Sequence, residues 1–66
     1  MQILVNGAPR EVPEQMTVLT LLAEFGWAER RVAVECNGEI VPRSTHAAVT
    51  LAAGDRLEII QAVGGG

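Results

Sequence analysis

The chain has 66 residues, a formal net charge of −3, 48% hydrophobic residues and only 3% aromatic ones. This length allows one domain, residues 1–66, near the lower limit for a self-supporting core, and the single cysteine, Cys36, excludes an internal disulfide. The acidic charge and the lack of a basic stretch argue against nucleic acid and anionic membranes, and without a signal peptide or membrane span a cytoplasmic protein is expected.

The first element predicted is a β-hairpin. Residues 1–5 are rich in β-formers and run into Asn6-Gly7, a strong signal for a two-residue hairpin turn. Residues 10–12 then form the returning strand. Pro13 ends this strand because proline cannot donate to a strand ladder.

A short amphipathic helix follows the hairpin. Thr17 occupies the expected N-cap, Met16 and Leu21 are spaced for a hydrophobic staple, and Gly26 is the expected residue after the C-cap. Apolar residues recur at helical spacing, at Val18, Leu21, Leu22 and Phe25. We interpret this stripe as a core face against a sheet, with a partner-binding face as the alternative.

Residues 27–31 are interpreted as a solvated surface loop, and a second hairpin follows them. Its strands are predicted at 32–36 and 39–41, joined by Asn37-Gly38. Cys36 is in register with Val32 and Val34 and is predicted to be a small buried hydrophobe, since neither a base nor a resolving cysteine is visible.

The segment after Pro42 carries the polar side chains whose roles stay open. Residues 43–48 are predicted to form one helical turn capped by Ser44. The lone histidine, His46, is expected to be structural or solvated, because no ligand or triad partner accompanies it. Arg43 either anchors an acidic partner or is free surface.

The last predicted strand covers residues 56–60 and follows a turn at 53–55. Leu57 and Ile59 share one face of this strand, while Glu58, Ile60 and Ala62 share the other. The flexible tail, residues 62–66, ends in Gly64-Gly65-Gly66, which cannot pack but can carry the carboxylate of Gly66 through a narrow slot. A frayed end or an expression remnant is the alternative.

These elements predict an α+β fold. The economical arrangement is a mixed sheet of four to five strands, with the first and last strands side by side in the centre and one helix on one face. This is the β-grasp, or ubiquitin-like, fold.

Specific residues then carry a family resemblance. Residues 1–5 look like the opening of ubiquitin, and residues 57–66 look like its last strand and diglycine tail. Residues 32–35, 37–46, 54–60 and 63–66 together resemble the ThiS sulfur carriers of the thiamine pathway, and the match covers essentially the whole chain.

The resemblance implies a carrier protein with no bound cofactor rather than an enzyme. In that family a ThiF-type adenylyltransferase uses ATP to adenylate the terminal carboxylate, here that of Gly66. Sulfur from a cysteine desulfurase route then replaces AMP, and the resulting thiocarboxylate supplies thiazole synthase (ThiG). By this similarity Gly65 provides a thin approach to Gly66, and Gly64 is an added small residue.

A docking surface for a partner is predicted at the root of the tail. If Ile3 and Val5 face the helix, Leu4 faces outward and is expected beside Ile60 and Ala62. We therefore expect an apolar patch of these three residues, flanked by Arg56 and Glu58. Scattered surface hydrophobes are the alternative interpretation.

Three other functional classes stay open at this point. The small subunit of molybdopterin synthase uses similar tail chemistry, although the short chain and low aromatic content count against it. A protein modifier would end in an isopeptide bond, and all five basic residues here are arginine, so no side-chain amine could accept a second copy. An interaction module with an inert tail is the last class.

Overall fold

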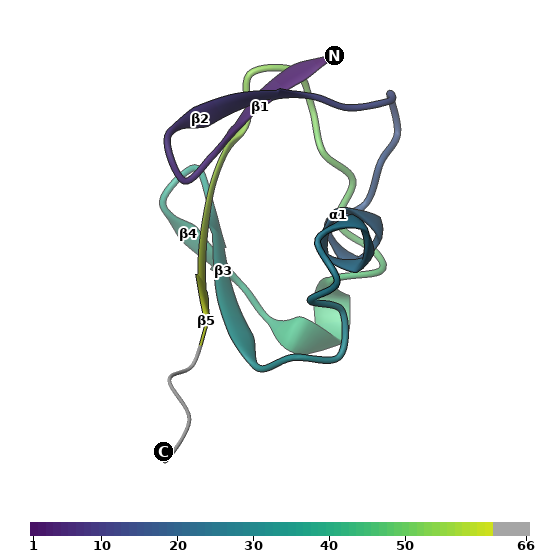
Figure 1. Ribbon diagram of the computed structural model, residues 1–66, viewed down its shortest axis with the longest axis vertical. Helices are drawn as coiled ribbons and strands as arrows, with labels where there is room; N and C mark the ends of the chain where they lie inside the picture. Colours follow the sequence, from purple (N-terminus) through teal and green to yellow (C-terminus); the bar gives the residue numbers. More distant parts are fainter. Residues whose placement is uncertain (62–66) are drawn as a thin grey trace.

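A computed structural model describes residues 1–61 of the chain, which form one five-stranded mixed sheet with a helix on one face (Figure 1). The strand order is β2-β1-β5-β3-β4. The central strands β1 (Gln2–Val5) and β5 (Arg56–Gln61) run parallel, and the other neighbours are antiparallel. The predicted β-grasp arrangement, with the first and last strands side by side in the centre, is confirmed.

Both predicted hairpin turns are present. β1 and β2 (Ala8–Glu11) are joined by Asn6 and Gly7, with φ angles of 51° and 83°. β3 (Val32–Cys36) and β4 (Glu39–Val41) are joined by Asn37 and Gly38, with φ angles of 55° and 87°. Positive φ at both turn residues matches the right-handed twist of the strands.

β2 begins two residues earlier than the predicted strand at 10–12 and includes Pro9, which lies opposite Leu4. β2 is an edge strand, so the missing N–H of a proline does not interrupt the sheet there.

The helix α1 (Val18–Glu24) begins and ends as predicted. The side chain of Thr17 accepts a hydrogen bond from the backbone N–H of Thr20 at 3.1 Å, and Gly26 follows the helix with a φ of 78°. Seven residues are too few for a helix to persist alone. Its buried side chains therefore hold it against the sheet, and these are Val18, Leu21 and Leu22.

The core between helix and sheet is aliphatic, as the composition predicted. Its fully buried side chains come from β1, α1, β3 and β5, and they are Ile3, Val18, Leu21, Leu22, Val34 and Leu57.

The start of the segment 27–31 is not the solvated loop that was expected. Trp27 stacks on Phe25 with ring centroids 4.7 Å apart, and the guanidinium of Arg10 lies 4.4 Å from the Phe25 ring centroid. This stack covers core surface that one short helix leaves open.

The turn at 43–48 forms, but Ser44 does not cap it. A 3-10 helix, η1 (Arg43–Thr45), begins after Pro42 without a side-chain cap, and the hydroxyl of Thr45 donates to the carbonyl of Pro42 at 2.8 Å. His46 follows it and is only 5% exposed, with Nε2 3.1 Å from the carbonyl oxygen of Val41. Of the two alternatives expected for His46, structural or solvated, its burial fits the structural one.

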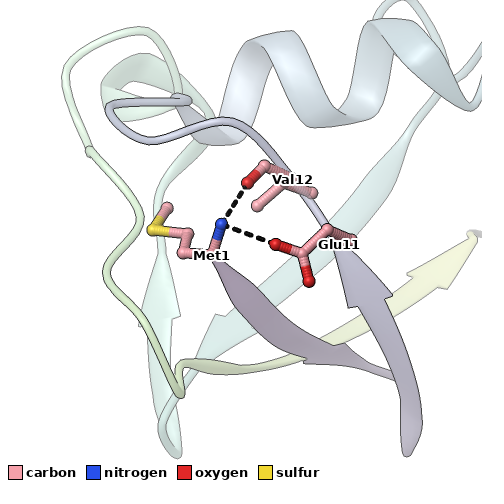
Figure 2. Close-up of polar contacts among 3 residues, drawn as sticks. All are labelled: Met1, Glu11 and Val12. Atoms are coloured by element: carbon pink, nitrogen blue, oxygen red, sulfur yellow. Dashed lines mark hydrogen bonds and ion pairs between the residues drawn. The ribbon is translucent and has the colours of Figure 1, made fainter.

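The chain's first amino group is also tied down. The ammonium of Met1 donates to the carbonyl of Val12 at 2.7 Å and pairs with the Glu11 carboxylate at 2.9 Å (Figure 2). These contacts fasten the open end of the β1-β2 hairpin. No helix within residues 1–61 has the length and apolar character needed to cross a membrane.

Candidate functional site

The root of the predicted tail is the end of β5, and the core fixes its position. Leu57 and Ile59 are 0% and 5% exposed and point to the helix side, as predicted. β5 also pairs with β3 over five residues, and that register ends with Val32 opposite Gln61. A rigid strand therefore leads to the point where the tail begins.

Four of the predicted site residues lie outside the described residues. They are the three tail glycines, Gly64, Gly65 and Gly66, and the patch residue Ala62. The modification of Gly66, the parts played by the other glycines and the docking role of Ala62 stay predictions.

Asn6 fastens β5 from the side of β1. Its side-chain Nδ2 donates to the carbonyl of Ile59 at 3.2 Å, and its Oδ1 accepts from the Ile59 N–H at 2.7 Å. The backbone ladder between β1 and β5 stops at Leu57, whose carbonyl accepts from the N–H of Asn6. The amide side chain thus takes over the pairing for two further residues of β5. The sequence marked Asn6 only as a turn residue, and no local signal indicated this contact across 53 positions.

The register corrects the predicted docking patch. Leu4 lies on the outer face, as expected, but its partner in β5 is Arg56 and not Ile60. Ile60 lies four positions beyond Arg56 along β5, which is about 13 Å at the usual rise per residue. Leu4 and Ile60 therefore do not adjoin, because the parallel register places β1 beside the beginning of β5.

The outer-face neighbours of Ile60 come from β3 instead. Ile60 is 62% exposed and lies opposite Ala33. Ile40, in β4, is 75% exposed and lies opposite Glu35 on the same face. We call Ala33, Ile40 and Ile60, together with Glu35 and Glu58, the outer-face patch. Its β3 and β4 members were missed in the sequence, although the Asn37-Gly38 turn fixes their register.

Two carboxylates lie directly opposite each other within this patch. Glu35 in β3 pairs in register with Glu58 in β5, and neither forms an ion pair with a residue in the range 1–61. Like charges that face each other across strands destabilise a sheet. We therefore expect this pairing to cost free energy in the isolated chain, and a basic group placed over both carboxylates would remove that cost.

Cys36 is half-buried rather than fully buried, and its surroundings suppress its reactivity. Burial, and then the neighbouring carboxylates of Asp55 and Glu39, raise the pKa of its thiol. A raised pKa keeps the thiol protonated near neutral pH, and the protonated form is a poor nucleophile. These surroundings therefore do not activate the thiol of Cys36 as a nucleophile.

Residues 1–61 contain no group of three or more histidine, cysteine, aspartate or glutamate side chains placed to hold a metal ion.

Comparison with known proteins extends over the whole chain. The ThiS family matches residues 3–66. A crystal structure of the thiamine biosynthesis protein (ThiS) from Geobacter metallireducens superposes with a TM-score of 0.85 and 38% identity, covering 100% of both chains.

Two curated relatives are thiazole synthases. The one from Paramagnetospirillum magneticum is 48% identical over 66 residues, and the one from Magnetococcus marinus is 39% identical over 66 residues. The chain spans 20% of the length of each of these relatives. The match over residues 3–66 and the like fold confirm the resemblance found in the sequence, and the chain belongs to the ThiS family.

Proposed function

We propose that the chain is a sulfur carrier for the biosynthesis of the thiamine thiazole. The observation that carries this proposal is the extent of the family match, which runs from residue 3 through the three C-terminal glycines. The solved structure that matches the chain over the full length of both proteins is that of a thiamine biosynthesis protein. The match favours this role over a molybdopterin-synthase subunit or a protein modifier.

The proposed cargo site is the carboxylate of Gly66. A carboxylate is a poor acyl donor, so an activating enzyme must first supply a leaving group. An oxygen of the carboxylate attacks the α-phosphorus of ATP, pyrophosphate leaves, and an acyl-adenylate forms. A sulfur nucleophile, supplied by a cysteine desulfurase route, then attacks the carbonyl carbon. AMP leaves with one of the original oxygens, and attack by a donor persulfide leaves an acyl disulfide. A thiol then cleaves the S–S bond of this acyl disulfide, supplies the two electrons, forms a disulfide with the donor sulfur and releases the thiocarboxylate.

The chain itself catalyses none of these steps in this proposal. The ThiF-type adenylyltransferase binds ATP, and thiazole synthase receives the sulfur. The relatives support the second partner, because the part of each thiazole synthase that matches this chain is covalently joined to the rest of that enzyme. The contribution of the chain is a rigid strand that presents the tail.

The outer-face patch is the proposed docking surface for the activating enzyme. Its exposed isoleucines, Ile40 and Ile60, supply apolar contact area on β4 and β5. Between them the facing carboxylates of Glu35 and Glu58 offer a site for a basic side chain. Leu4 and Arg56 lie further along the same face and would form its rim.

The mass of the intact protein tests the carrier function. The chain is incubated with the activating enzyme, ATP and the sulfur source, and we expect a gain that corresponds to one oxygen exchanged for sulfur. The same chain lacking Gly66 is the control and should show no gain. If the full chain keeps its ordinary carboxylate after complete exposure to all three components, the proposed function is wrong.

Substitution within the outer-face patch tests the docking surface. Ile60→Asp should raise the KM of the activating enzyme for the carrier at least about tenfold, because a desolvated apolar contact is replaced by a charge. Gln2→Asp adds the same charge on β1, at the far end of the sheet from Ile60, and should leave the KM nearly unchanged. Equal KM values for Ile60→Asp and the unaltered chain, with both folded, would show that the outer-face patch is not the docking surface for the activating enzyme.

A further inference from the structure

A hollow on the helix side of the molecule is not used by the function proposed above. It has a volume of about 190 Å³ and lies between α1, residues 28–32 and η1. Its floor is apolar and includes the buried Leu22 and the half-buried Ala28 and Val32. Its polar lining comes from exposed Arg30, Arg43 and Ser44 and from buried His46. Apolar side chains with arginines around them form an amphipathic site.

The charge in this hollow is opposite to that of the chain. The chain carries a net charge of −3, yet the lining residues include two arginines and no carboxylate. Within residues 1–61, neither Arg30 nor Arg43 forms an ion pair. Arg30 makes one weak contact, from Nη1 to Oε1 of Gln61 at 3.3 Å. Among the described residues, most hydrogen-bond donors of these two guanidinium groups therefore have no acceptor.

The hollow lies beside the root of the tail. Val32 lines it and is the β3 partner of Gln61, the last described residue of β5. Figure 1 shows the end of β5, the start of β3 and the short turn of η1 at the same end of the molecule. An enzyme that encloses the tail has to pass over this end, so the hollow falls within reach of its surface.

We propose that this hollow receives a carboxylate side chain, flanked by an apolar residue, from the enzyme that takes sulfur from the tail. Guanidinium groups bind carboxylates through paired, charge-assisted hydrogen bonds, and arginine is enriched at protein interfaces. The apolar floor lowers the local dielectric and strengthens such a pair once water is excluded. Ser44 supplies an additional hydroxyl donor at the rim.

The partner that we propose is a thiazole synthase, and this choice rests on the proposed function. In the two thiazole synthases related to this chain, the matching part occupies 20% of one polypeptide. Covalent joining keeps the matching part close to the rest of each enzyme, so a surface of this part that is complementary to the enzyme would be used. The helix-side hollow is separate from the outer-face patch, since helix and patch lie on opposite faces of the sheet.

Charge reversal at the rim tests the proposal. The unmodified chain is titrated against thiazole synthase from the same organism, and Kd is measured by calorimetry at low and high salt. We expect Arg43→Glu and Arg30→Glu each to raise Kd at least about tenfold, because attraction becomes repulsion at a partly desolvated site. Arg31→Glu changes the net charge equally at an exposed position outside the lining, and Kd should rise less than about threefold.

A charge-neutral variant provides a second test in case the charge-reversal variants do not fold. Arg43→Gln should raise Kd by a smaller factor and make Kd less dependent on salt than in the unaltered chain. Thermal unfolding checks that each variant is folded. The proposal is overturned if Arg31→Glu weakens binding as much as Arg43→Glu, if no variant changes Kd, or if the unaltered chain does not bind. Since this titration uses the ordinary carboxylate form, its outcome is independent of whether Gly66 accepts sulfur.

Discussion

Removal of the Asn6 side chain is the sharpest test of how the root of the tail is held. Asn6→Gly keeps a residue that tolerates the φ of 51° but deletes both hydrogen bonds to Ile59. At roughly 0.5 to 1.5 kcal/mol net for each bond, the loss should be about 1 to 3 kcal/mol of unfolding free energy. For a domain of this size that corresponds to a fall in Tm of about 5 to 20 °C.

Two further substitutions separate the causes of this loss. Asn6→Ala removes the same bonds and also places a Cβ in the left-handed region, so it should be less stable than Asn6→Gly. Asn37→Gly is the matched control, because Asn37 holds the same turn position with a φ of 55° and also bonds to β5. Its contacts are exposed, so water can replace them, and we expect a loss about half as large as that of Asn6→Gly.

Urea unfolding followed by circular dichroism and by Trp27 fluorescence measures these differences. Hydrogen exchange adds a local measurement, because the amide of Ile59 loses its acceptor in Asn6→Gly and should exchange faster relative to the amide of Val34 in the core. An Asn6→Gly protein within about 0.5 kcal/mol of the unaltered chain, which is the range of neutral surface changes, would refute this reasoning.

Three further predictions follow from the contacts described above. Glu58→Gln should raise the free energy of unfolding by a few tenths of a kcal/mol, because it relieves the repulsion from Glu35. The same substitution should raise the KM of the activating enzyme for the carrier. A lower free energy of unfolding in urea titrations would contradict the expected gain in stability. Acetylation of the Met1 amine removes its positive charge, and with it the ion pair to Glu11, but leaves one N–H that can still donate to Val12. The cost should be about 0.5 to 2 kcal/mol, and an unchanged urea midpoint would show that the charge contributes nothing. Because folding raises the pKa of the Cys36 thiol, the protonated thiol stabilises the fold below the pKa of the unfolded chain, and this contribution is lost as the pH rises through the pKa of the folded chain. The Cys36→Ala protein should therefore lose less unfolding free energy than the unaltered chain over this alkaline pH range. Iodoacetamide should also alkylate the thiol of the native protein more slowly than the thiol of the unfolded chain.

The sequence by itself determined the elements and their order, because the signals for them are local. Asn6-Gly7 and Asn37-Gly38 specify their hairpins through backbone conformations that few other residues adopt. Thr17 sets the start of the helix and Gly26 sets its end, and both act on backbone groups only a few residues away. Alternation along β5 correctly assigned Leu57 and Ile59 to the core and Ile60 to the outer face, since the period of a strand is two.

Only the tertiary structure decided which residues meet. Alternation gives the face of a strand but not its register, so Leu4 was expected beside Ile60 and lies beside Arg56. The bonds from Asn6 to Ile59, the facing pair of Glu35 and Glu58, and the hollow between Arg30 and Arg43 all join segments far apart in the chain. Such contacts depend on strand pairing and on packing of the helix, and both are set by the whole core rather than by any local pattern.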